Sequence, residues 1–306
     1  MDISTRWALL VDTHPSSWIE FVGMLATQIL TFWLPASIFT MLDLLAWPSI
    51  QRYKIQPARK QPPRELIIRD ALLGSLQSQL LSTTLQALQL AVVHAVLARP
   101  DLSYRMPATL PTLPELLTEL TLCVLARETM YYYSHRVLHH PLLYARFHRQ
   151  HHRFHTPVAL ATLYVHPVEH ILTNVMPIAA PARLFDVHVV TLWVFVGAVG
   201  IQAALAHCGY RLFETPGGWK PEVHDLHHEL MTVNYGLIGL LDRVHGTRAT
   251  RKLRKREQIQ GGNAARGRAL LGQGGKIEEE KCCIGKKLRM PICKEECNLW
   301  DRRYDG

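Results

Sequence analysis

Long apolar segments constrain the fold of this chain more than any other feature of its sequence. The first runs from Trp18 to Trp47, and others follow at about 71–97, 116–133 and 171–206. A helix needs about 20 mostly apolar residues to cross a bilayer, and each segment is close to that length or longer. The sequence therefore predicts an all-α fold, that of a multi-pass helical integral membrane protein.

The alternative is a soluble helical protein that buries these segments in its core. Four glutamines in the second segment favour it, because amide groups that face lipid are costly: Gln77, Gln79, Gln86 and Gln89. The composition favours the membrane instead. Charged residues make up 19% of the chain, whereas about 25% is usual for soluble domains.

The basic residues are unevenly distributed. Residues 1–247 hold 18 Lys/Arg and 17 Asp/Glu, whereas residues 248–306 hold 16 and 8. The body of the chain is thus near neutral, which argues against nucleic acid as a partner despite the net charge of +9. Six basic residues lie between 52 and 69, and the positive-inside rule places this loop in the cytoplasm. Residues 248–306 lack hydrophobic periodicity and are predicted to be a basic, disordered tail.

Histidine is concentrated in one part of the chain. Of 17 histidines, 15 lie between positions 135 and 245. They include one H-x-x-x-H cluster and two H-x-x-H-H clusters: His135 and His139; His148, His151 and His152; His224, His227 and His228. Residues three or four apart lie on one face of a helix. We therefore expect the imidazoles of each cluster to point the same way.

Eight imidazoles are too many for one metal ion. A structural zinc takes four ligands and a catalytic zinc takes about three from the protein. Imidazole suits iron, zinc, copper and nickel, and suits magnesium or calcium poorly. The sequence therefore predicts an all-histidine site for two metal ions with four or five ligands each. Crossing out at 71–97 and back at 116–133 returns the chain to the cytoplasm before the first cluster, so the site is expected to face the cytoplasm.

Other histidines extend this prediction. His207 follows the fourth apolar segment and is the candidate ninth ligand. His166, His170 and His245 could be ligands or could support ligands through hydrogen bonds. A ligating histidine usually donates its second N–H to a carboxylate or a carbonyl. The carboxylates of Glu128, Glu169 and Asp225 are candidates for that role.

The three clusters resemble the boxes of the fatty acid hydroxylase/sterol desaturase superfamily, in the same order. Similar segments also occur at 164–170, 207–210 and 234–247. The nearest resemblance is to the C-4 methylsterol oxidase branch and to proteins like fatty acid hydroxylase domain-containing protein 2. The resemblance divides the chain into an N-terminal membrane segment (1–50), a hydroxylase/desaturase-type domain (51–247) and the tail (248–306).

The resemblance implies a non-haem di-iron enzyme in the endoplasmic reticulum membrane. Such an oxidoreductase, a monooxygenase or desaturase, uses O2 to hydroxylate or oxidise a sterol or related lipid. Its electrons come from NAD(P)H through cytochrome b5 and a reductase. A fatty acyl or sphingolipid hydroxylase and a terpenoid-tailoring oxygenase would carry the same boxes. A zinc-dependent membrane hydrolase is the alternative of another class, but it leaves five or more histidines unexplained.

Overall fold

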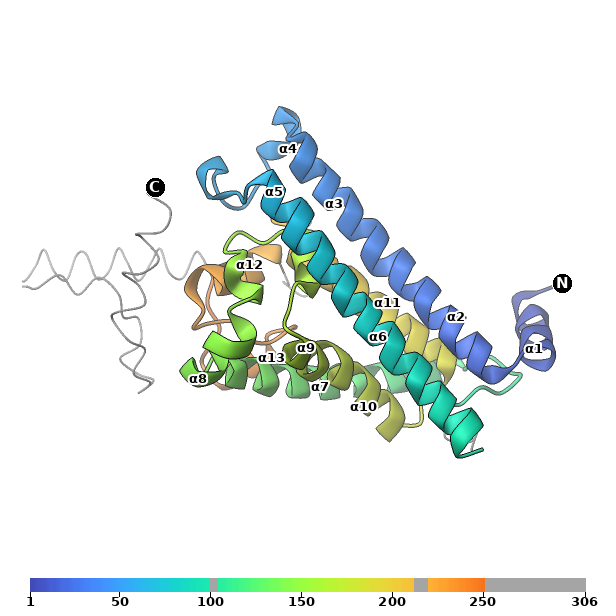
Figure 1. Cartoon of the computed structure of the whole chain (residues 1–306). Coiled ribbons are helices and arrows are strands. Elements are labelled where there is room, and N and C mark those ends of the chain that lie inside the picture. Colours follow the sequence, from blue (N-terminus) through green and yellow to red (C-terminus); the bar gives the residue numbers. More distant parts are fainter. Residues whose placement is uncertain (99–103, 212–219, 251–306) are drawn as a thin grey trace, which may run out of the picture. The chain divides into compact units, whose positions relative to one another are not determined.

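The computed structural model describes residues 1–98, 104–211 and 220–250, which form helices and no β-strand (Figure 1). The all-α fold is therefore confirmed for the described part of the chain. Its longer helices are α1 (Ile3–Thr13), α2 (Ser16–Gln28), α3 (Leu34–Leu45), α6 (Leu73–Ala91), α7 (Leu113–Leu138), α10 (Met176–Leu184), α11 (Val189–Ala206) and α12 (Pro221–Leu230). Short helices are α4 (Pro48–Gln51), α5 (Arg64–Leu66), α8 (Pro141–Leu143), α9 (Pro167–Glu169) and α13 (Leu240–Val244). Nearly all of the predicted tail lies outside the described residues.

Several helices continue into one another through π-helical turns. The turn at Ile29–Trp33 joins α2 to α3, so that one helix covers Ser16–Leu45. The turn at Ile67–Leu72 joins α5 to α6, which a further turn at Val92–Val96 extends. The turn at His170–Val175 joins α9 to α10. The apolar segments of the sequence thus become long helices.

Two of the described helices are long and apolar enough to cross a membrane: Ser16–Leu45 and α11. The predicted spans at 71–97 and 116–133 also form helices, but they carry more polar side chains than these two. The fourth predicted segment is broken between α10 and α11, as its prolines and charged residues indicate. The multi-pass topology stays a prediction.

The two candidate membrane helices pack against each other. Gly23 of α2 faces the ring of Trp193 in α11, where an added Cβ would lie 2.1 Å from the Cζ2 atom. Gly200 of α11 similarly faces Thr31, whose Oγ1 would lie 2.7 Å from a Cβ at position 200. Small residues at such positions let two helix backbones approach closely. Figure 1 shows α11 running beside this long helix.

The glutamines of α6 are partly satisfied inside the protein. The Nε2 of Gln79 donates to Gln28 Oε1 at 2.6 Å, and its Oε1 accepts from the indole N–H of Trp33 at 2.8 Å. The Nε2 of Gln86 donates to the carbonyl of Glu20 at 3.4 Å. These two amides therefore need no contact with lipid, which removes part of the case for a soluble fold.

Helix α6 also holds the segment that follows the second histidine cluster. The hydroxyl of Ser75 donates to the carbonyl of Leu160, and the hydroxyl of Ser78 donates to that of Leu163 at 2.7 Å. Gly74 lies against the ring of Tyr164. The segment also contacts α11, where the hydroxyl of Thr162 donates to the carbonyl of Ala203 at 3.3 Å.

Candidate metal centre

Nine histidines converge in two groups. The first group contains His135, His139, His148, His152 and His227. The second group contains His151, His207, His224 and His228. Within each group, one imidazole nitrogen per residue lies within 4.8 Å of the others. The structure therefore brings together all nine of the main sequence candidates, including His207.

The division runs through each H-x-x-H-H cluster, so the expectation that its three imidazoles point the same way is wrong. Each cluster sends the two residues four positions apart to one group and its middle histidine to the other: His148 and His152 against His151, and His224 and His228 against His227. The middle histidine directly precedes the last one, and consecutive residues of a helix point about 100° apart, so the two imidazoles can reach different groups. Each H-x-x-H-H cluster therefore contributes histidines to both groups.

The Nε2 atoms are the ones that converge. In the first group, the Nε2 of His139 lies 3.3 Å from that of His135, 3.0 Å from that of His148 and 3.2 Å from that of His227. In the second group, the Nε2 of His207 lies 2.9 Å from that of His224. Two nitrogens that are each about 2.1 Å from one ion lie roughly 3 Å apart. The spacing fits a metal ion in each group.

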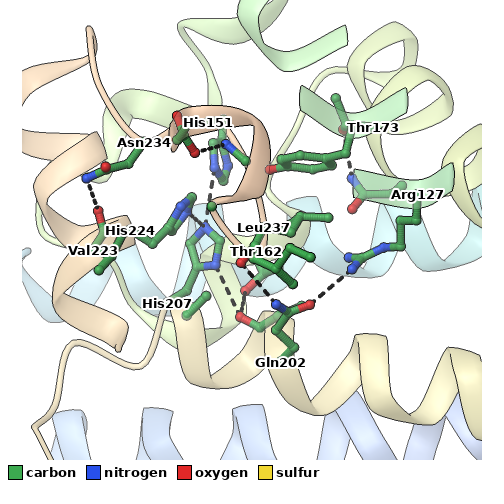
Figure 2. Close-up of a pocket in the computed structure, with 18 of the residues that line it drawn as sticks. Arg127, His151, Thr162, Thr173, Gln202, His207, Val223, His224, Asn234 and Leu237 are labelled. Carbon is green, nitrogen blue, oxygen red and sulfur yellow. Dashed lines mark hydrogen bonds between the residues drawn. The ribbon is translucent and has the colours of Figure 1, made fainter. Parts of the chain in front are cut away.

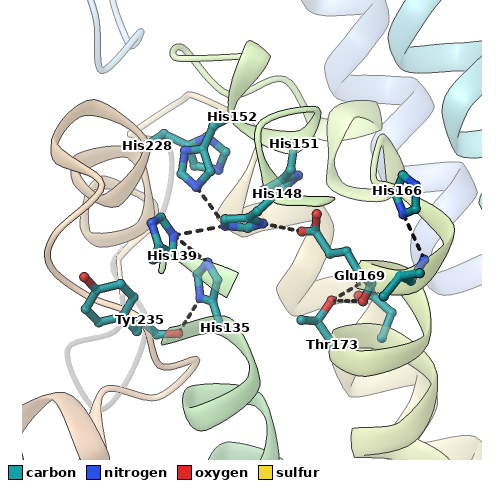
Figure 3. Close-up of polar contacts among 12 residues, drawn as sticks. His135, His139, His148, His151, His152, His166, Glu169, Thr173, His228 and Tyr235 are labelled. Atoms are coloured by element: carbon teal, nitrogen blue, oxygen red, sulfur yellow. Dashed lines mark hydrogen bonds and ion pairs between the residues drawn. The ribbon is translucent and has the colours of Figure 1, made fainter. Parts of the chain in front are cut away.

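In four of the nine histidines, a hydrogen bond holds the opposite ring nitrogen, whereas the Nδ1 atoms of His151, His152 and His228 are buried without a partner. An Nδ1–H donates to a protein oxygen in four cases: His135 to the Tyr235 carbonyl at 2.7 Å, His227 to the Val233 carbonyl at 2.7 Å, His207 to the Ala203 carbonyl at 3.2 Å and His148 to Glu169 Oε1 at 2.7 Å. A proton on Nδ1 leaves the Nε2 lone pair free to bind metal. Figure 3 shows His148 directed between Glu169 and the other imidazoles.

Of the three candidate carboxylates, Glu169 bonds directly to a clustered histidine. Glu128 instead accepts backbone N–H groups from the loop after α12, at 2.8 Å from Leu237 and 3.0 Å from Ile238. Asp225 accepts from the Nε2 of Gln56 at 3.0 Å. Glu128 thereby anchors the loop whose carbonyls orient His135 and His227. That indirect role has no signal in the sequence.

Burial keeps these imidazoles neutral. It lowers the pKa of His135 and of His207 to about 4. It also lowers the pKa of the other seven well below the usual value, and neighbouring imidazoles add to the effect. Neutral imidazole is the form that binds metal. The nine side chains are therefore ready to act as ligands at neutral pH.

The three secondary candidates lie outside both groups. The Nδ1 of His166 accepts from the backbone N–H of Val168 at 3.2 Å, and Figure 3 shows its ring apart from the clustered imidazoles. The Nε2 of His170 lies 2.7 Å from the hydroxyl of Ser82, and that of His245 lies 3.0 Å from the hydroxyl of Tyr133. The structure therefore places none of the three among the nine clustered histidines, and a supporting role for them stays a prediction.

A cavity borders the second group (Figure 2). His151, His207 and His224 line one part of it, and Arg127 and Gln202 line another. Apolar side chains of the loop after α12 and small residues of α11 also line it, as do the carboxyl groups of Glu169 and Asp242. Sequence reasoning missed Arg127 and Gln202 as site residues, because they come from helices that contact each other only in the folded protein.

Comparison with known proteins agrees with this geometry. A family model described as fatty acid hydroxylase matches residues 120–247, which include all nine clustered histidines. The human protein fatty acid hydroxylase domain-containing protein 2 is 32% identical over 79% of this chain and 71% of its own length. This chain belongs to the fatty acid hydroxylase family. The superfamily resemblance seen in the histidine boxes is thus confirmed.

Other relatives of this chain carry related names. Methylsterol monooxygenase 2-2 of Arabidopsis thaliana is 25% identical over 76% of the chain and 86% of its own length. A very-long-chain aldehyde decarbonylase of Oryza sativa subsp. indica is 25% identical over 84% of the chain and 97% of its own length. No solved structure matches the chain significantly. The family and these names indicate an oxidoreductase.

Proposed function

We propose that this fatty acid hydroxylase family member is a membrane-bound, non-haem di-iron oxygenase that hydroxylates or oxidises a sterol or related lipid with O2. The observation that carries the proposal is the convergence of nine Nε2-bearing imidazoles in groups of five and four. The first group would hold one iron ion and the second group the other. Two iron ions supply the activation of O2 that oxidation of an unactivated C–H bond requires.

The role of the protein residues is to bind the metal ions and to orient the ligand side chains. Buried neutral imidazoles offer lone pairs without having to lose a proton first. Glu169 and the carbonyls of Tyr235 and Val233 fix the rings of three ligands in the first group. Burial also limits the access of water, which protects reactive species from side reactions.

The cavity supports a lipid substrate. Part of its wall comes from α7, from α11 and from the apolar loop residues Leu237 and Ile238. Because α11 is a candidate membrane helix, a hydrophobic substrate could enter from the bilayer. The names of the human and Arabidopsis relatives support a sterol or fatty acyl substrate. The experiment below tests sterols first, with acyl lipids, sphingolipids and terpenoids as the next candidates.

The proposal places the histidines on the cytoplasmic side of the endoplasmic reticulum membrane, within a domain at 51–247. Support comes from the basic segment 52–69, which contacts α12. The Nζ of Lys60 lies 3.2 Å from Glu229 Oε1, and Gln56 donates to Asp225. The basic segment and the histidines of α12 thus lie on one side, where cytochrome b5 and a reductase could deliver electrons from NAD(P)H.

A zinc-dependent hydrolase fits the same residues less well. A catalytic zinc takes about three protein ligands and leaves a position for water. Groups of five and four imidazoles exceed that requirement for each ion. The ligand number therefore favours the di-iron oxygenase.

The test is metal content combined with O2-dependent turnover. The full chain is purified anaerobically in detergent with iron(II), then supplied with NADPH, a reductase, cytochrome b5 and 4-methylsterols. We expect about two irons per chain and a product that gains oxygen. H227A should abolish turnover, whereas H140A, which changes an exposed histidine outside both groups, should not.

Each result has a distinct meaning. Two irons with no sterol turnover would move the substrate search to acyl lipids, sphingolipids and terpenoids. One tightly held zinc with no O2 consumption would overturn the oxygenase and favour the hydrolase. Turnover that survives H227A would show that the clustered histidines are not the site.

A further inference from the structure

The cavity beside the second histidine group contains a buried cation. Arg127 lies in α7 and is 8% exposed. Its Nη1 donates to Gln202 Oε1 at 3.0 Å, and its buried Nε has no hydrogen-bond partner. Figure 2 shows the guanidinium directed toward Gln202 at the cavity wall.

No carboxylate pairs with this guanidinium among the described residues. The neighbouring acid, Glu128, uses both of its oxygens on backbone N–H groups: Oε2 accepts from Leu237 and Ile238, and Oε1 accepts from Leu240 at 3.0 Å. Glu128 still acts on Arg127 electrostatically, but the buried Nε–H of Arg127 has no acceptor, and an unsatisfied buried donor costs free energy. Arg127 lies in the predicted span 116–133, and a charged residue within a membrane span usually marks a functional site.

We propose that Arg127 binds the carboxylate of a lipid acid, which lies in the cavity with its hydrocarbon part beside the second histidine group. This inference rests on the proposed function, because it identifies a recognition group of the same substrate. Gln202 positions the guanidinium: its Oε1 accepts from Arg127, and its Nε2 donates to the Leu237 carbonyl at 3.2 Å.

The geometry of the guanidinium favours a carboxylate over other oxygen groups. With Nη1 engaged by Gln202, the edge formed by Nε and Nη2 remains. A planar carboxylate accepts two parallel hydrogen bonds from such an edge and cancels one positive charge. A hydroxyl offers a single uncharged oxygen, and a doubly charged phosphate would bring an excess of negative charge.

Arg248 is the other arginine that lines the cavity. Its substitution can therefore be compared with that of Arg127. Arg248 is half-buried and comes from the segment after α13. If Arg248 were the anchor, its removal rather than that of Arg127 would abolish recognition of the acid. Arg243 is exposed and does not line the cavity, so R243Q controls for the loss of one positive charge.

The test measures equilibrium binding without turnover. The iron-loaded full chain, in neutral detergent without O2 or reductant, is titrated with palmitic acid, with 3β-hydroxy-5-cholestenoic acid and with the methyl ester of each. We expect at least one acid to bind tenfold or more tightly than its ester. R127Q should reduce that ratio to near one, R127K should keep part of it, and R248Q and R243Q should retain it.

The ratio separates recognition from folding, because a purely structural arginine would weaken acid and ester binding equally. Equal binding of acid and ester to the unmodified protein, for both pairs, would overturn the proposal. So would a ratio that survives R127Q or is lost in R248Q. If R127Q does not fold, Q202L replaces it and should lower the ratio. Iron content and turnover test the proposed function separately, so its failure is distinguishable.

Discussion

The carboxylate of Glu169 lies 2.7 Å from the Nδ1 atom of His148, and both side chains are buried. The Nε2 atom on the opposite side of that ring lies 3.0 Å from the Nε2 atoms of both His139 and His152. An acid at the end of α9 thereby fixes the orientation of an imidazole in the middle of the first group.

Removing this acid should weaken metal binding. Hydrogen-bond partners of ligating histidines are typically worth about 10- to 100-fold in metal affinity. We therefore expect E169A to reduce the affinity of the first group by that factor. E169Q should lose less, because its amide oxygen still accepts from Nδ1–H. Titration with cobalt(II), followed by visible absorbance, measures this, and E65A at an exposed acid is the control. Unchanged affinity in E169A would contradict the role of Glu169.

The candidate ligands were largely predictable, whereas their supports were not. Spacing within the chain identifies the three clusters, and the end of an apolar segment identifies His207. The carbonyls of Val233 and Tyr235 orient two ligands, but a backbone carbonyl leaves no trace in residue identity. The anchor of that loop, Glu128, lies more than 100 positions away in the sequence.

The helices were predictable, but their environment was not. Apolar runs identify the long helices, because a helix that is buried or faces lipid needs apolar side chains. The glutamines of α6 suggested a soluble protein, yet Gln79 bonds to Gln28 and Trp33 of a neighbouring helix. Hydropathy alone cannot distinguish an amide that is satisfied by a neighbour from one that faces solvent.

Acid should destabilise the metal-free protein within a defined window. Burial lowers the pKa of His135 and His207 to about 4, whereas an unfolded histidine titrates near about 6.5. The unfolded state thus binds more protons between these values, so stability falls as pH falls from about 6.5 to about 4. Above about pH 7 these residues contribute no pH dependence.

Thermal unfolding of the chelator-treated protein measures this dependence. We expect a constant Tm between about pH 7 and 8 and a falling Tm below about 6.5. Replacing His207 with Gln should make the fall of Tm with pH shallower, because Gln does not take up a proton when the protein unfolds. A Tm that does not change down to about pH 4.5 would contradict burial of neutral imidazoles.

Adding a methyl group at Gly23 should disturb the contact between the candidate membrane helices. Its Cβ would lie 2.1 Å from the ring of Trp193, and overpacking of this kind typically costs about 1–3 kcal/mol. We expect G23A to lower Tm, and G23A/W193A to lose less stability than the sum of the two single variants. V22A, at a more exposed position on the same helix, is the matched control. Strict additivity of G23A and W193A would show that the two residues do not contact each other.

Pairs of substitutions within one histidine cluster should reveal its division between two ions. H148A/H152A removes two ligands from the first group and none from the second, so about one ion per chain should remain. H151A/H152A removes one ligand from each group. It should therefore weaken both ions while eliminating neither. Metal analysis after dialysis against graded chelator concentrations distinguishes the two patterns, with H140A retaining both ions. Identical metal loss in the two double variants would mean that the cluster serves one ion, against the arrangement in which its middle histidine belongs to the other group.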